Sequence, residues 1–236
     1  MDEFDVNSLQ SVFFVESLKT GDKLDFARSV VNATRGIFDG DPMILPLPEE
    51  QEQAPPDVPY IVLKSKNNWY RCNICGNRID LFFKRGKDIG QNISELWPDY
   101  KNIIKDFSNY IKETLNEKIW RLGFVATFVK DVGRSVNEIL NGAYLQPNIF
   151  EDSHEIQLNI LKKINFKSFN INRWIKFRPL RIKEDLSQDF GMSIEIDINT
   201  IAEKVYDFDK EEIMEFFNFA HENIVIEVPK YILIKS

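Results

Sequence analysis

The sequence predicts an α+β protein in which helices pack on antiparallel sheet. Residues 192–199 alternate Met or Ile with polar residues, which is the period-2 pattern of a half-buried strand. Residues 98–117 carry apolar side chains at the three- and four-residue spacing of an amphipathic helix. Several strand-like segments follow one another across short turns, and short connections favour antiparallel pairing.

The first 59 residues are predicted to form a strand–helix element and a linker, laid across the rest of the protein. Residues 11–17 have the composition of a strand, and Asp22 can cap a helix that ends near Gly36. Residues 42–59 contain six prolines, which remove backbone donors and fix φ. We therefore expect an extended connector there rather than a helix or a central strand.

Residues 60–150 are predicted to form a first half, built from a meander and a helix. Turn-forming residues separate the strands, and Pro98 can serve as the first residue of the helix. The expected elements, in order, are strands at 60–65, 69–74 and 78–84, a helix at 98–117, a strand at 119–129 that is buried on both faces, and a short helix at 135–145.

Residues 151–236 are predicted to form a second half with the same β-β-β-α-β order. Asp209 and Glu212 have the spacing of a capping box at the start of its helix. No residue-level repeat accompanies the repeated order, so two similar halves are a hypothesis about topology alone. The expected elements are strands at 155–164, 168–178 and 191–199, a helix at 210–223 and a strand at 224–228.

The chain has a basic middle between two acidic ends. Residues 1–58 hold 4 basic and 12 acidic side chains, residues 59–183 hold 22 and 12, and residues 184–236 hold 4 and 13. The formal net charge of −7 therefore hides a strong partition. Opposite local fields can steer a polyanion, attract an acidic protein patch, or pair with each other within the fold.

The N-terminal residues and the two cysteines favour a cytoplasmic protein. The first ten residues lack the basic and apolar regions of a secretory signal, and no apolar run approaches the ~20 residues that span a bilayer. Two cysteines cannot form a disulfide framework, which agrees with a reducing compartment. We expect no membrane association.

The chain offers few residues for catalysis or metal binding. Cys72 and Cys75 have the spacing of a zinc or redox pair, but two further ligands are missing, so packing cysteines are favoured. His221 lies near the apolar stripe of the last helix, which favours a core or boundary position, and His154 lies in a loop whose neighbours cannot form a catalytic triad. No phosphate-binding glycine motif occurs. We therefore expect no catalytic residues, no metal ligands and no cofactor.

Two carboxylates on one strand keep a metal-dependent nuclease open as an alternative. Glu195 and Asp197 share a strand face, as paired metal ligands do in nucleases, but no lysine lies nearby in the sequence. The solvated side of a strand explains both residues as well.

The stretch 156–183 is the leading candidate binding region, for nucleic acid or for a protein partner. It has eight basic residues, no acidic ones and four interleaved Phe and Trp side chains, a composition suited to phosphate neutralisation and base stacking. Strand alternation divides the set, because Arg173 and Phe177 face one way and Lys176 and Arg178 the other. The alternative is a sheet whose charges pair with the acidic C-terminal segment. The candidate residues are Lys162, Lys163, Lys167, Arg173, Lys176, Arg178 and Arg181.

Several short motifs together resemble a family of bacterial proteins. They are Leu45-Pro46-Leu47-Pro48, Pro55-Pro56-Asp57-Val58-Pro59, Arg78-Ile79-Asp80, Arg121-Leu122-Gly123-Phe124, Asn172-Arg173 and Asp197-Ile198-Asn199-Thr200. The family is sporadically distributed, uncharacterised and associated with mobile elements and antiviral defence loci. The resemblance implies no catalytic residues. It implies an accessory subunit that works beside a larger enzyme.

These observations predict a non-catalytic interaction or accessory subunit of a bacterial protein complex, with a role in antiviral defence. Its partner is expected to be a protein encoded nearby. The alternatives are a nucleic-acid-binding module that uses residues 156–183, and a metal-dependent nuclease. A homo-oligomer is also left open.

Overall fold

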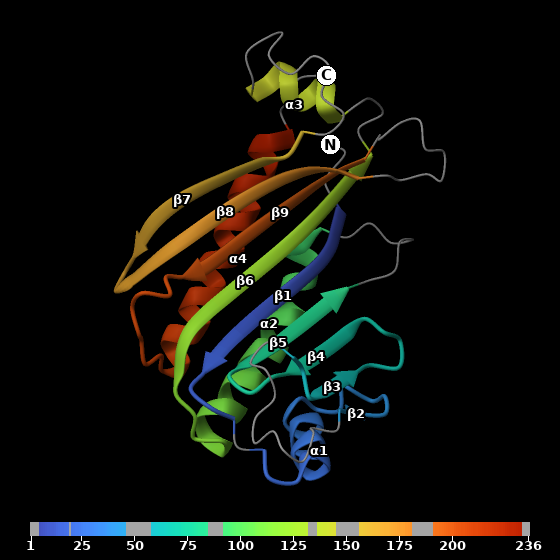
Figure 1. Ribbon diagram of the computed structural model, residues 1–236, viewed down its shortest axis with the longest axis vertical. Helices are drawn as coiled ribbons and strands as arrows, with labels where there is room; N and C mark the ends of the chain where they lie inside the picture. The colour runs from blue at the N-terminus through green and yellow to red at the C-terminus, as the bar shows by residue number, and fades with distance from the viewer. Residues whose placement is uncertain are drawn as a thin grey trace.

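The computed structural model describes residues 5–18, 20–45, 58–84, 92–131, 136–144, 156–180 and 191–232. These residues form one nine-stranded sheet in the order β2-β3-β4-β5-β1-β6-β9-β8-β7, and every neighbouring pair is antiparallel. Helices α2 and α4 lie side by side behind this sheet (Figure 1). The predicted α+β class with antiparallel sheet is confirmed.

Two long strands form the centre of the sheet. β1 (Asp5–Val15) pairs with β6 (Ile119–Asp131) from Asp5 opposite Val129 to Val15 opposite Ile119. The sequence predicts β1 only over 11–17, in an element laid across the protein, and this position was wrong. A register shift between Val6 and Ser8 interrupts the alternation of apolar residues, which hides the first half of the strand.

We call the strands on the β5 side of this central pair the first arm. The predicted meander is confirmed as β3 (Ile61–Lys64), β4 (Tyr70–Ile74) and β5 (Arg78–Lys84). The arm ends with β2 (Met43–Ile44), which pairs with β3. This strand lies in the stretch predicted to be an extended connector, but it is only two residues long and occupies an edge, where nearby prolines are tolerated.

We call the strands on the other side the second arm. It consists of β9 (Gly191–Thr200), β8 (Phe169–Leu180) and β7 (Leu158–Phe166), as the sequence predicts within a few residues. Nine consecutive pairs join β7 to β8 without a register shift. A two-residue turn closes this hairpin, and its first residue, Lys167, has a φ of 51°.

The two main helices differ from their predicted bounds. α2 (Ile93–Asn109), which continues into the π-helical turn η1 (Tyr110–Thr114), begins before Pro98, because the Asn92 side chain accepts a hydrogen bond from the Ser94 N–H at 2.9 Å and caps the helix there. α4 (Lys210–Ile232) continues through the predicted strand at 224–228. Ile224 lies about one turn after Ala220 and is buried like it, so the apolar run extends the helix stripe. The β-β-β-α-β order is therefore not repeated.

Aromatic side chains connect the central strands to both helices. The ring of Phe13 lies 6.2 Å from Phe107 of α2 and 5.4 Å from Phe217 of α4. Phe124 of β6 similarly contacts Trp97 and Phe217, at 5.7 and 6.0 Å. All of these rings are buried, and each contributes on the order of 2 kcal/mol through removal from water. β6 was predicted to be buried on both faces, but only the side facing the helices is fully buried.

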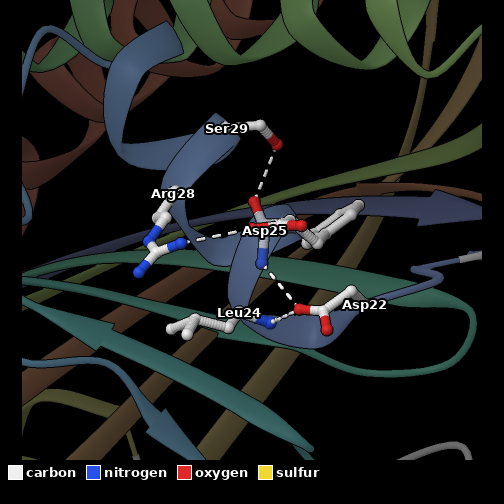
Figure 2. A network of polar contacts seen from close by, with 6 residues as sticks. Asp22, Leu24, Asp25, Arg28 and Ser29 are labelled. Atoms are coloured by element: carbon white, nitrogen blue, oxygen red, sulfur yellow. Dashed lines mark hydrogen bonds and ion pairs between the residues drawn. The ribbon is translucent and has the colours of Figure 1, made fainter.

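Two shorter helices complete the described fold. Asp22 caps α1 (Lys23–Ala33) as predicted, since its carboxylate accepts hydrogen bonds from the N–H groups of Leu24 and Asp25, at 2.8 and 3.0 Å (Figure 2). The predicted helix at 135–145 is α3 (Val136–Tyr144). No helix among the described residues is both long and apolar enough to cross a membrane.

Candidate binding surface on the open sheet face

The face of the sheet turned away from α2 and α4 carries the polar residues of the strands, and we call it the open face. In Figure 1 it is turned toward the viewer. Residues directly opposite each other in antiparallel strands share a face, so the pairing register traces rows of side chains across the sheet. One row consists of Met43, Val62, Asn73, Asp80, Val12, Gly123, Asn199, Asn172 and Lys163. The next consists of Lys64, Arg71, Phe82, Gln10, Val125, Asp197, Trp174 and Leu161.

The centre of the open face is flat and nearly neutral. Gly123 leaves no side chain there, and a Cβ at this position would lie 3.4 Å from the Cβ of Val12. Val12 and Val125 flank this glycine on the open face. Charged side chains therefore surround a centre of small and apolar groups.

The one acidic residue of the first arm on this face is satisfied by its neighbours. Asp80 accepts hydrogen bonds from Arg78 Nε at 3.0 Å and from Gln10 Nε2 at 3.2 Å. Burial raises the pKa of Asp80 above its ordinary value, although the Arg78 charge acts in the opposite direction. The Asp80 carboxylate therefore contacts Arg78 and Gln10 rather than solvent.

The two acidic residues of the second arm are also satisfied. Glu195 forms an ion pair with Lys176 at 2.6 Å, and Asp197 accepts a hydrogen bond from Asn199 Nδ2 at 2.9 Å. Burial raises the pKa of Asp197, against the effects of Asn199 and Lys176. The sequence near Glu195 contains no lysine, but the fold brings Lys176 of β8 to it. This lysine neutralises the Glu195 carboxylate.

The basic residues of the open face outnumber these carboxylates. Lys176 and Arg78 are paired, and Arg121 donates to Asn199 Oδ1 at 3.3 Å and lies over the Phe14 ring at 4.8 Å. Five others are exposed and form no ion pair within the described part of the chain, although the charge of Arg71 also acts on the pKa of Asp80. They are Lys64, Arg71, Lys84, Lys163 and Arg178. Asp5 of β1 lies opposite Val129 and is an exposed acid on the same face. The exposed cations outnumber it, so the uncompensated charge of this face is positive, and it lies on both arms.

The structure divides the seven predicted binding residues. Lys163, Lys176 and Arg178 lie on the open face, as alternation predicts. Lys162 and Arg173 lie opposite each other on the helix side of the sheet.

Two of the seven are neutralised by α4, in agreement with the predicted pairing between the basic stretch and the acidic C-terminal segment. Arg173 forms an ion pair with Glu227 at 3.1 Å, and Lys167 forms one with Glu215 at 2.6 Å. Arg181 lies outside the described residues.

Sequence reasoning missed the half of this surface that comes from the first arm. Lys64, Arg71 and Lys84 are separated in sequence by turns, but the register brings them to the same face as Lys163. The same alternation rule, applied to residues 60–84, would have placed them together. The missing information was the strand order, which no local pattern contains.

A hollow of about 620 Å³ lies on the second arm. Its lining includes Lys163, Asn165 and Asn172, together with Glu203 from the segment after β9. The Oδ1 atom of Asn172 is buried and has no hydrogen-bond partner. Amide and charged groups therefore converge beside β7.

The other candidate residues have packing roles. Cys72 and Cys75 are buried thiols, and burial raises the pKa of Cys72 well above its ordinary value, which disfavours the reactive thiolate. His221 stacks on Trp97 at 4.4 Å, and burial lowers its pKa to about 4. His154 lies outside the described residues. Among the described residues, no three His, Cys, Asp or Glu side chains are grouped as metal ligands would be.

Comparison with protein-family models, with curated proteins and with solved structures finds no match for this chain.

Proposed function

We propose that this chain is a non-catalytic interaction subunit of a protein complex, and that its open face binds an acidic surface of a partner protein. One observation carries the proposal. Asp80, Glu195 and Asp197 each have a partner on the open face, whereas five exposed cations there form no ion pair among the described residues. Such a surface attracts an anionic partner and sets its orientation.

The arrangement of charge favours a protein over a nucleic acid. Protein interfaces combine a dry, weakly polar centre with a charged rim. On the open face, Gly123 and Val12 lie at the centre, Lys163 ends their row, and Lys64 ends the neighbouring row.

Nucleic acid remains the second candidate because rings accompany the cations. The Arg71 guanidinium lies 4.4 Å from the centre of the Phe82 ring, and Trp174 lies on the same row of the open face. Rings and cations on one sheet face suit single-stranded nucleic acid. Glu195 and Asp197 give no comparable support to a metal-dependent nuclease, because their nearest partners are Lys176 and Asn199.

The bacterial setting and a role in antiviral defence are part of the proposal, and they rest on the resemblance of the sequence motifs. A subunit of this kind is expected to copurify with a protein encoded beside its gene.

The proposal is tested with a 20-residue polyglutamate peptide and a 20-nucleotide single-stranded DNA, titrated against the purified protein. Reversing two first-arm charges, Lys64→Glu with Arg71→Glu, should weaken polyglutamate binding by about tenfold. Lys105→Glu makes the same kind of change on the exposed surface of α2 and should leave binding unchanged. Equal losses in both variants would contradict the proposal.

The DNA titration distinguishes nucleic-acid binding, the second candidate, from binding of an acidic protein. Contacts to Z phosphates should give a log–log salt slope of about −0.7Z for single strands. Tight DNA binding with a steep slope that Lys64→Glu with Arg71→Glu abolishes, together with no polyglutamate binding, would replace the protein partner with nucleic acid.

A further inference from the structure

The two edges of the sheet are built very differently. One ends with the two-residue β2, whereas the other ends with β7, whose nine residues all pair regularly with β8 on the inner side. No described strand pairs with the outer side of β7, and Figure 1 shows it as the outermost strand. Long regular edge strands are templates for pairing with another chain.

The outward backbone groups of β7 follow from its hairpin. A two-residue turn makes the flanking pair, Phe166 and Phe169, a hydrogen-bonded pair, and hydrogen-bonded pairs then alternate along the ladder. The residues between them, Asn159, Leu161, Lys163 and Asn165, therefore point their N–H and C=O groups away from β8.

The side chains of β7 suit an acidic, partly apolar segment. Ile160 and Leu161 are 37% and 41% exposed and lie on opposite faces of the sheet. Lys162 and Lys163 follow them, also one on each face, and neither has an ion-pair partner in the described part of the chain. The edge thus presents an apolar group and a free cation on each face.

We propose that β7 accepts an extended acidic segment of a partner protein as a tenth strand of the sheet. Main-chain hydrogen bonds to the outward groups would supply affinity, and Lys162 and Lys163 would select acidic residues. The same lysines disfavour pairing of β7 with a second copy, because the strand contains two lysines and no acid. This inference concerns the edge of the sheet. The edge shares Lys163 with the open face, but Lys162 and the outward backbone groups of β7 belong to the edge, and neither proposal requires the other.

The register predicts the sequence of the incoming strand. An antiparallel partner strand meets Lys163 first and Ile160 last. From its N-terminus to its C-terminus, it should therefore contain two acidic residues, opposite Lys163 and Lys162, followed by two apolar residues, opposite Leu161 and Ile160. A blocked octapeptide, Thr-Thr-Glu-Glu-Val-Val-Thr-Thr, is therefore the probe. A second peptide replaces both glutamates with lysines, and a third keeps the glutamates but carries N-methyl groups on alternate backbone nitrogens.

Binding is measured by calorimetry and by amide hydrogen exchange of the full chain. The first peptide should slow the exchange of the Leu161 and Lys163 N–H groups, and N-methylation should abolish this effect. The Lys162→Glu variant should bind the glutamate peptide about tenfold more weakly than the original protein does. It should bind the lysine peptide instead. Lys64→Glu, on the open face, should leave both affinities unchanged, so failure of one proposal is distinguishable from failure of the other.

Three results would overturn this inference. They are equal binding of the N-methylated peptide, loss of binding in Lys64→Glu but not in Lys162→Glu, and a dimer of the free protein in which the Leu161 and Lys163 N–H groups are already protected. The last result would assign the edge to a second copy of this chain.

Discussion

The two arms of the sheet each contain one buried ion pair, but the acid alone is deeply buried in the first arm, whereas both partners are largely buried in the second. In the first arm the Asp80 side chain is only 3% exposed and its partner Arg78 is 26% exposed, on the open face. In the second arm the Arg173 side chain is 8% exposed beneath α4, and its partner Glu227 is 13% exposed. Desolvation therefore falls mainly on the acid in the first arm and on both partners in the second.

Because of this difference, the pKa values of Asp80 and Glu227 shift in opposite directions. Burial raises the pKa of Asp80, and its hydrogen bonds and the Arg78 charge do not compensate fully. Burial acts in the same direction on Glu227, but the hydrogen bond from Lys230 and the charge of Arg173 outweigh it, so the pKa is lowered. The surroundings of a carboxyl group, rather than the presence of an arginine partner, therefore decide the sign of its pKa shift.

Replacing the buried base of the second arm should have the largest effect on stability. Arg173→Met would remove the guanidinium partner of Glu227 of α4 and leave this carboxylate with the more exposed Lys230 alone, and loss of one member of a buried pair costs about 3 kcal/mol. We expect the free energy of unfolding, measured by urea denaturation, to fall by about this amount. The double variant Arg173→Met with Glu227→Leu should recover most of the loss, because no uncompensated charge remains. A double variant as unstable as the single one would show that Arg173 acts through packing alone.

The N-terminal caps of α4 and α2 should also contribute unequally to stability, by less than the effect of replacing Arg173. α4 begins with the predicted capping box, in which Asp209 Oδ1 accepts the Glu212 N–H at 2.8 Å and Glu212 Oε2 accepts the Asp209 N–H at 3.1 Å. α2 begins with the single bond to Asn92. Asp209→Ala should therefore cost about 1 kcal/mol and Asn92→Ala somewhat less, both measured by urea denaturation. The reverse order would indicate that the second bond of the box contributes nothing.

Replacing Asp80 should change the free energy of unfolding least at neutral pH. The effect of this residue should instead be seen in how stability depends on pH. A raised pKa means that the folded protein holds the Asp80 proton above pH 3.8, where the unfolded chain releases it, so stability falls as pH rises through this window. A lowered pKa means that Glu227 stabilises the fold above its ordinary pKa of 4.5, and that this contribution is lost as pH falls below that value.

Asp80→Asn should therefore change the free energy of unfolding by less than about 1 kcal/mol at neutral pH, with any loss shrinking as pH rises from about 3 to about 7. The loss caused by Glu227→Gln should grow over the same range. Urea denaturation at several pH values compares the two directly. Parallel pH profiles for the two variants would contradict the contrast between the arms.

Much of the local structure could be predicted from periodicity. The alternation of Ile194 and Ile196 with Glu195 and Asp197 identified β9 and its two faces, because a strand places successive side chains on opposite sides. The Asp209–Glu212 spacing identified the start of α4. The end of α4 was missed because an apolar run that includes Ile224 satisfies a strand and a buried helix face equally well.

The candidate surface was predictable only in part for a similar reason. Alternation correctly separated Arg173 from Lys176 and Arg178. It could not show that Lys176 would meet Glu195, or that α4 would supply Glu227 to Arg173, because both contacts join segments distant in sequence.

By itself, the sequence determined the class of the fold, most of its elements, and the faces of the strands whose apolar residues alternate regularly. These features depend on local geometry, which repeats every two residues in a strand and every 3.6 in a helix. The tertiary structure alone decided that β1 lies at the centre, that the cations of both arms share one face, and that β7 is a long edge. The reason is physical: strand order and neutralisation of charge depend on which distant segments pair, and many pairings satisfy the same local pattern.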